Sequence, residues 1–198
     1  MEGLVDKMAL LHPSFVGTQY RLANNWYNFV PQRGNPIKYL EIGTFYGANA
    51  ISVCNSYAKH PESEVYCIDP WIEYDDYPEK GYGQETTFQA FKTNVSNAGL
   101  QNKIKVHRGF SHQMIPLFED NFFDMIYIDG NHEPEYVLED AVLSFRKLKV
   151  GGYLIFDDLD WGGPDLVTRG INGFLSAYHK RVTKLGVQET QVFVQKNR

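Results

Sequence analysis

Short apolar runs alternate with segments of helical periodicity from Gly34 to the C-terminus. Uninterrupted apolar runs are typical of strands that are covered on both faces, as in a parallel sheet. Five such strands are predicted, at residues 38–42, 64–68, 104–107, 123–128 and 153–156. Because helical segments fall between them, we expect an α/β fold in which helices connect parallel strands.

The helical segments repeat apolar residues at intervals of three and four, which places those residues on one helix face. After them, residues 181–186 and 190–195 form two strand-like runs that are joined too closely for a helical crossover. These runs are expected to pair antiparallel. The prediction is a doubly wound, mostly parallel seven-stranded sheet with an antiparallel C-terminal strand pair. The helical repeats lie at residues 50–57, 88–95, 138–145 and 167–175.

An amphipathic stripe of Leu22, Trp26, Phe29 and Val30 precedes the first strand and ends at a proline-containing breaker, residues 31–36. We interpret residues 1–36 as an N-terminal helical cover over the site and residues 37–198 as the core. No internal repeat, low-complexity tract or long linker divides the sequence. One domain is therefore expected.

Composition narrows the class of function. The 198 residues carry 19 basic and 24 acidic side chains, and the net charge of −5 disfavours nucleic acid as a partner. Cys54 and Cys67 lack CxxC spacing and predict neither a zinc site nor a disulfide framework. The sequence has no signal-peptide pattern and no apolar run of about 18 residues. We expect a soluble, cytoplasmic protein without a membrane partner.

The most informative segment, residues 39–49, runs from a predicted strand through a glycine turn into a helix. Gly43 and Gly47 permit backbone angles and close approaches that other residues do not, so backbone amides there can face an anionic ligand group. Phe45 occupies the position of the second glycine in a dinucleotide-binding motif. NAD and FAD are therefore disfavoured.

Two acidic residues end neighbouring predicted strands. Glu41 is placed to accept a hydrogen bond from an ammonium group or a bound water, although an acid before a glycine is also common in ordinary turns. Asp69 ends the next strand, where a carboxylate can accept two hydrogen bonds from a ribose diol. Together the two acids favour a cofactor that contains a nucleoside.

These features resemble the class I S-adenosylmethionine-dependent methyltransferases, which share an acidic-x-Gly-x-x-x-Gly loop after strand one and an acidic ribose ligand after strand two. Residues 41–44, 128–132 and 151–158 further resemble the macrocin-type sugar O-methyltransferases. The resemblance implies a Rossmann-like fold and S-adenosylmethionine as the methyl donor. It places the donor on Glu41, Gly43, Thr44, Gly47, Asn49, Asp69, Phe110 and Ser111.

Three of these residues have specific expected roles. Asn49, where many relatives carry serine or threonine, is expected to hydrogen-bond the methionine carboxylate. Phe110 is expected to pack on the adenine and Ser111 to hydrogen-bond its edge. A strand-to-helix turn capped by Ser111 explains the same residues without a ligand.

Asp129 ends the fourth predicted strand, and Asp157 and Asp158 end the fifth. Their carboxylates should converge at the edge where open α/β sheets bind ligands, and oxygen ligands favour Mg²⁺ or another small divalent cation. The three residues are the predicted metal ligands. The alternative is a solvated loop in which Asp158 or Asp160 caps a turn.

His132, three residues after Asp129, is the predicted general base, and the two form the predicted catalytic pair. A histidine on a turn is also often an ordinary polar surface residue. Other histidines, His107 and His112, are expected to be structural or to lie beside the cofactor. The acceptor is expected between an acidic, aromatic loop at residues 71–83 and a second wall at 161–164, although the loop would also fit a surface segment packed on the domain.

The predicted function is metal-assisted O-methylation of a sugar or another small polyhydroxy acceptor. The predicted partner is therefore a small-molecule or glycan acceptor. The sequence is also compatible with a homo-oligomer. The alternatives are a catechol- or caffeoyl-type phenolic O-methyltransferase and a non-catalytic S-adenosylmethionine-binding module. An RNA methyltransferase is less compatible with the negative net charge.

Overall fold

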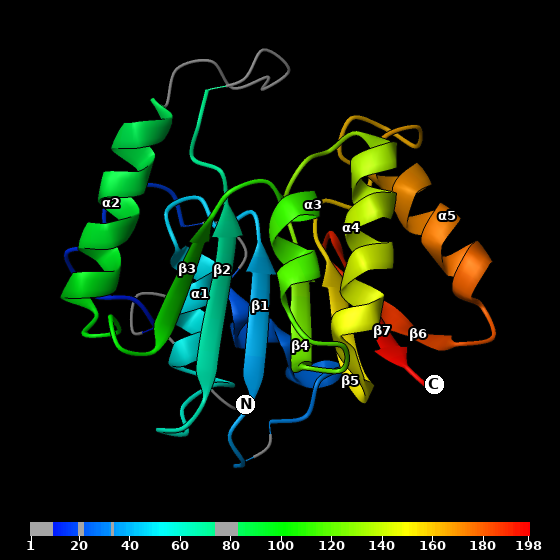
Figure 1. The fold of residues 1–198 in the computed structure, drawn as a ribbon, viewed down its shortest axis with the longest axis horizontal. Helices are drawn as coiled ribbons and strands as arrows, with labels where there is room; N and C mark the ends of the chain where they lie inside the picture. Colours follow the sequence, from blue (N-terminus) through cyan, green and yellow to red (C-terminus); the bar gives the residue numbers. More distant parts are fainter. Residues whose placement is uncertain (1–9, 20–21, 33, 74–82) are drawn as a thin grey trace.

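The computed structural model describes residues 10–19, 22–32, 34–73 and 83–198. These residues form one seven-stranded sheet with the strand order β3-β2-β1-β4-β5-β7-β6 (Figure 1). The strands are β1 (Lys38–Ile42), β2 (Glu64–Asp69), β3 (Ile104–Arg108), β4 (Phe123–Ile128), β5 (Leu148–Phe156), β6 (Val182–Gln188) and β7 (Gln191–Lys196).

The direction of the strands confirms the predicted fold class. Strands β1 to β5 pair in parallel, whereas β7 pairs antiparallel with both β5 and β6. The arrowheads of β1 and β2 point to the top of Figure 1, which marks the carboxyl edge of the parallel strands. Ligands of open α/β sheets bind at this edge.

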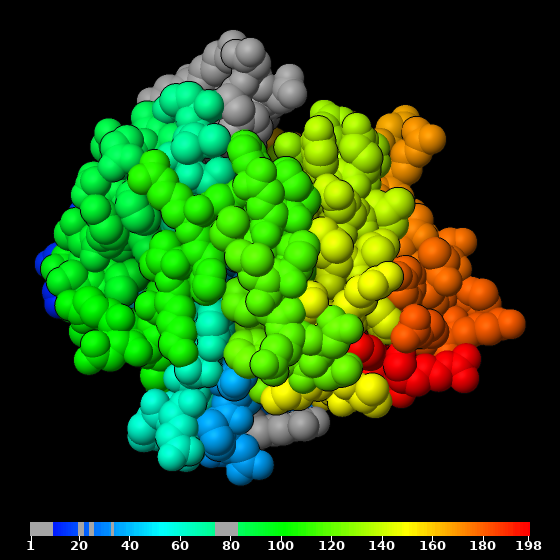
Figure 2. All heavy atoms as spheres, viewed as in Figure 1, coloured from blue at the N-terminus to red at the C-terminus, as the bar shows by residue number. Residues whose placement is uncertain are grey.

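Helices cover both faces of the sheet, as expected for a doubly wound fold. One apolar core lies between the strands and α1 (Ala48–Cys54), α2 (Gln84–Asn97) and the 3₁₀ helix η2 (Ala23–Asn28). The other lies between the strands and α3 (Ser111–Met114), the 3₁₀ turn η3 (Ile115–Leu117), α4 (Pro134–Lys147) and α5 (Val167–Tyr178). Figure 2 shows how the green to yellow segments hide most of the sheet on the second face.

Among the described residues of the predicted N-terminal cover, residues 23–28 form the 3₁₀ helix η2. Trp26 is fully buried against the sheet face, with its ring centroid 5.3 Å from that of Tyr127 and 6.3 Å from that of Tyr39. Its indole Nε1 donates a 2.8 Å hydrogen bond to Gln191 Oε1. The helix η2 therefore packs on the sheet over β1, β4 and β7. The division into an N-terminal cover and a core stays a prediction.

Strand β5 begins at Leu148, five residues before its predicted start. Gly151 and Gly152 interrupt the apolar run, so the periodicity alone does not reveal this part of the strand. A Cβ atom on Gly152 would lie 2.9 Å from the carbonyl oxygen of Asp124, which shows why the strand needs glycine there. The pairing of β4 with β5 shifts register in the same region.

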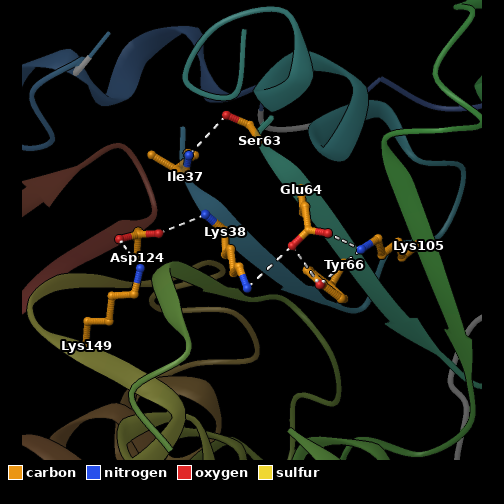
Figure 3. Close-up of polar contacts among 8 residues, drawn as sticks. All are labelled: Ile37, Lys38, Ser63, Glu64, Tyr66, Lys105, Asp124 and Lys149. Carbon is orange, nitrogen blue, oxygen red and sulfur yellow. Dashed lines mark hydrogen bonds and ion pairs between the residues drawn. The ribbon is translucent and has the colours of Figure 1, made fainter. Parts of the chain in front are cut away.

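A network of charged residues holds the amino ends of the strands together (Figure 3). The Asp124 carboxylate accepts 2.8 Å hydrogen bonds from the backbone N–H of Lys38 and from Lys149 Nζ. Glu64 contacts both Lys38 and Lys105. A cavity of about 280 Å³ also lies at this edge, lined in part by Asp124 and Lys149, and it is remote from the carboxyl ends of the strands.

Candidate functional site

The glycine loop after β1 lies directly against the end of β4. Gly43 has a φ of +80°, and a Cβ atom there would lie 1.8 Å from the backbone oxygen of Asp129. The Asp129 N–H also donates a 2.9 Å hydrogen bond to the carbonyl of Ile42. Only glycine fits this contact. The loop predicted to bind the donor therefore lies beside Asp129, which is one of the two predicted catalytic residues.

Gly47 begins helix α1 and has a φ of +84°. A Cβ atom on Gly47 would lie 2.8 Å from the ring of Phe91 on α2. The second glycine of the loop is therefore needed for close packing between the start of α1 and α2. Its predicted contact with the donor stays a prediction.

Glu41 is buried inside the protein and serves to hold α1. Its Oε2 accepts hydrogen bonds from Tyr39 Oη at 2.7 Å and from Asn49 Nδ2 at 2.8 Å. Burial raises the pKa of Glu41 to about 8, although these hydrogen bonds and one from the backbone of Ala50 lower it. Protein groups thus occupy much of the hydrogen-bonding capacity that the sequence assigned to the donor.

Asn49 has one polar atom left for a ligand. Its Nδ2 donates to Tyr39 Oη and Glu41 Oε2, whereas its Oδ1 is buried and has no hydrogen-bond partner among the described residues. An amide oxygen can only accept, so in this orientation it suits an ammonium group or a water and not the predicted methionine carboxylate. The buried Thr44 hydroxyl lies next to the Cys67 thiol, whose pKa it lowers.

Asp69 joins the glycine loop to the end of β2. Its Oδ2 accepts hydrogen bonds from the backbone N–H groups of Thr44 and Phe45, at 3.0 and 2.9 Å. Its Oδ1 accepts one from the N–H of Trp71 at 2.9 Å. Burial raises the pKa of Asp69, and the three backbone donors oppose this shift. Sequence analysis identified the acid but not its role in fixing the loop.

The segment after β3 contains the residues predicted to bind adenine. Phe110 stacks on His112 with ring centroids 5.7 Å apart, and Ser111 begins α3. The side chain of Ser111 hydrogen-bonds the carboxyl group of Asp140 on α4, and burial raises the pKa of Asp140 to about 7. Sequence analysis missed Asp140. The available signal was an acid within the apolar stripe of α4, next to Ala141.

Asp129, His132 and Asp158 form a compact group at the carboxyl edge of β4 and β5. One ligand atom from each of the three partly buried side chains lies within 4.8 Å of the others. His132 Nε2 is 3.0 Å from Asp158 Oδ2. Burial of the carboxylate, followed by repulsion from Asp157 and Asp158, raises the pKa of Asp129 well above its ordinary value. The group brings together two predicted metal ligands and the predicted base.

Asp157 lines the same pocket, but its carboxylate is bound to groups on β4, on β7 and in the turn before β7. Its Oδ1 accepts hydrogen bonds from the Asp158 N–H at 2.8 Å and from Thr190 Oγ1 at 3.0 Å. Its Oδ2 accepts one from the hydroxyl of Tyr127, and Gln191 Nε2 lies 3.5 Å away. Both residues follow the end of β5, and Asp158 has a φ of +57°, so the two neighbouring carboxylates have different partners.

Trp161 lies beside the group on the loop that follows β5. Its ring centroid is 5.1 Å from that of His132, and 47% of the residue is exposed. The Trp161 N–H donates a 2.9 Å hydrogen bond to the carbonyl of Asp158, which fixes the loop next to the carboxylates. The predicted opposite wall, residues 74–82 of the acidic, aromatic loop, lies outside the described residues.

His107 and the two cysteines lie outside the group of Asp129, His132 and Asp158. His107 packs against Phe118 and Tyr66, with ring centroids 4.9 and 5.9 Å apart. Cys54 and Cys67 are buried free thiols, and burial raises the pKa of both. Within the described part of the chain, no helix has the length and apolar character needed to cross a membrane.

Comparisons with known proteins bear on the family and the fold of the chain. A family model described as a methyltransferase domain matches residues 40–159. An uncharacterized protein of Acanthamoeba polyphaga mimivirus is 28% identical over 127 residues, which cover 62% of this chain. The chain spans 51% of the length of that curated relative.

Several solved structures share the fold. A putative O-methyltransferase from Klebsiella pneumoniae has a TM-score of 0.63 at 21% identity, covering 81% of this chain and 73% of that one. The O-methyltransferase TomG from Streptomyces achromogenes, in complex with SAM, has a TM-score of 0.62 at 18% identity, with coverage of 81% and 73%. An O-methyltransferase from Bacillus cereus, in complex with SAH, also has a TM-score of 0.62 at 18% identity, covering 81% and 74%.

Proposed function

Because the chain belongs to the methyltransferase domain family, within the class I S-adenosylmethionine-dependent methyltransferases, we propose that it methylates a hydroxyl oxygen of a small polyhydroxy acceptor such as a sugar. The observation that carries this proposal is the contact between the glycine loop at Gly43 and the backbone of Asp129. It joins the donor loop of the family to a group of two carboxylates and an imidazole.

The donor pocket is proposed to consist of the loop residues and the segment after β3. Asn49 Oδ1 is a buried acceptor atom without a hydrogen-bond partner among the described residues, and unpaired buried polar atoms cost free energy unless a ligand or water pairs them. Asp69 holds the N–H groups of Thr44 and Phe45 in place, so it shapes the loop before the donor arrives. Phe110 and Ser111 complete the proposed pocket on the adenine side.

The acceptor is proposed to bind beside Asp129, His132 and Trp161. The exposed indole of Trp161 offers a flat apolar surface for a sugar ring, and the carboxylates can accept hydrogen bonds from its hydroxyl groups. Methyl transfer is then a direct displacement. The acceptor oxygen forms a bond to the methyl carbon, the carbon–sulfur bond breaks, and S-adenosylhomocysteine leaves. The hydroxyl proton passes to solvent water as the oxygen attacks.

A divalent cation is part of the proposal. The carboxylates of Asp129 and Asp158 are ligands of the kind that such cations prefer, and they lie close enough to share one ion. When bound, the cation would supply Lewis acidity that lowers the pKa of the acceptor hydroxyl. Asp129 and His132 face the same space and are the proposed catalytic residues.

Two measurements test the proposal. Calorimetry with S-adenosylhomocysteine should show binding to the full chain, and radiolabelled S-adenosylmethionine should transfer its methyl group to members of a panel of sugars and glycosides. Catechols and RNA serve as comparison acceptors. Binding without any transfer would favour the non-catalytic module, and transfer to catechols alone would identify the phenolic class. Absence of S-adenosylhomocysteine binding would refute the proposed function.

A further inference from the structure

We propose that the metal centre consists of Asp129, His132 and Asp158, and that Asp157 positions this centre without binding the ion. The inference rests on the proposed metal-assisted function. It differs from the set of Asp129, Asp157 and Asp158 that the resemblance to sugar methyltransferases implies. It also assigns His132 as a ligand in place of the general base, so that the acceptor proton passes to solvent.

The hydrogen bonds of Asp157 are the first reason. An ionised carboxylate has about four lone-pair sites. Thr190, the Asp158 N–H, Tyr127 and Gln191 surround the two oxygens of Asp157, and the residue is only 3% exposed. To bind an ion in the group, Asp157 would have to give up several of these bonds and rotate out of the core. The cost of leaving buried donors unpaired opposes that change.

The surroundings of Asp129 and Asp158 are the second reason. No N–H or hydroxyl group of the described residues donates a hydrogen bond to the Asp129 side chain, whose contact is the carboxyl group of Asp158. Two carboxylates in contact repel each other unless a proton or a cation lies between them. The imidazole of His132, with Nε2 3.0 Å from Asp158 Oδ2, completes a converging set of one nitrogen and two carboxylates.

The donor set also indicates which cation it prefers. Carboxylates suit Mg²⁺ and Mn²⁺, whereas imidazole suits the transition metals and is a poor ligand for Mg²⁺. A set with one imidazole should therefore favour Mn²⁺ or Co²⁺ over Mg²⁺. We expect Mn²⁺ to bind at least about tenfold more tightly than Mg²⁺.

The structure provides an optical probe for this site. The sequence contains three tryptophans, of which Trp26 and Trp71 are 0% and 1% exposed. Trp161 is the exposed one, and it packs beside His132. Co²⁺ held by His132 should quench Trp161 fluorescence at stoichiometric concentration. Trp161→Phe should remove the signal while calorimetry still reports the bound ion.

The adjacent aspartates form a matched pair of variants. Asp158→Asn and His132→Gln should each raise the Kd for Mn²⁺ at least about tenfold, whereas Asp157→Asn should change it less than about threefold. Asparagine keeps an acceptor oxygen for the Asp158 N–H and the Thr190 hydroxyl, and thermal unfolding checks that each variant is folded. His179→Gln, at an exposed histidine bonded to the Ser176 carbonyl, controls for surface binding.

Pulsed electron paramagnetic resonance of Mn²⁺ gives a test that needs no variant. The wild-type chain with bound Mn²⁺ should show coupling to an imidazole ¹⁴N nucleus. Bound Mn²⁺ without that coupling, or a loss of affinity in Asp157→Asn equal to that in Asp158→Asn, would overturn the triad. Absence of any ion binding while S-adenosylhomocysteine still binds would refute the centre and leave the proposed methyl transfer intact.

Discussion

At the scale of single residues, Asp140 is a buried acid whose ionisation should weaken the fold. Its Oδ1 has no hydrogen-bond partner among the described residues, and its pKa is raised by burial from 3.8 to about 7. Between these values the unfolded chain holds fewer protons at this position than the native chain. The free energy of unfolding therefore falls as the pH rises through this window.

Asp140→Asn should remove this dependence. We expect the free energy of unfolding of the variant to fall by about 2–4 kcal/mol less than that of the wild type between pH 4 and pH 8. Urea unfolding at several pH values measures the difference. Glu135→Gln removes the same charge at an exposed position of α4 and should leave the slope unchanged. Parallel slopes for wild type and Asp140→Asn would show that this acid is ionised in both states.

Asp69 links the shape of the glycine loop to donor affinity. Asp69→Asn places an NH₂ group where the carboxylate now accepts from the N–H groups of Thr44, Phe45 or Trp71. Affinity for S-adenosylhomocysteine should fall by about 1–3 kcal/mol. Calorimetry measures it, with Asp120→Asn at the exposed amino edge as the control. Equal affinities for wild type and Asp69→Asn would remove Asp69 from the proposed pocket.

At the scale of elements, the contact between the glycine loop and the end of β4 requires that residue 43 has no side chain. Gly43 and Gly99 both have positive φ angles, but only Gly43 has no space for a Cβ atom. Gly99→Ala should cost about 1–2 kcal/mol from backbone strain alone, and Gly43→Ala at least about 3 kcal/mol. Thermal and urea unfolding compare the two. Similar losses would mean that the loop can move away from Asp129 at little cost.

The elements were more predictable than the site. Apolar runs located the parallel strands because strands buried on both faces need such runs, but the two glycines hid the start of β5. The site depends on side-chain direction at strand ends, which periodicity does not encode. Asp157 and Asp158 look equivalent in the sequence. The left-handed backbone at Asp158 and the donors on β4 and β7 separate them.

At the scale of the whole molecule, the charged network around Asp124 and the proposed chemistry lie at opposite edges of the sheet. Asp124→Ala removes the acceptor that ties the N–H of Lys38 to β4 and should cost about 1–3 kcal/mol. Affinity for S-adenosylhomocysteine should not change at a temperature where the variant is folded. Asp120→Ala, which removes an exposed ion pair with Lys147, should leave the free energy of unfolding almost unchanged. A large loss of affinity in Asp124→Ala would show that the two edges are coupled.

The position of β7 has a consequence for the order of folding. This strand lies between β5 and β6, although it follows both in the sequence. It brings Gln191, and Thr190 just before it, to Asp157, whose Oδ1 accepts from the Asp158 N–H. Pulse-labelled hydrogen exchange during refolding should therefore protect the Asp158 amide together with the amides of β7, and later than those of β1 and β4. During synthesis on the ribosome, the five parallel strands would therefore form before β7 completes the surroundings of Asp157 at the carboxyl edge of the sheet.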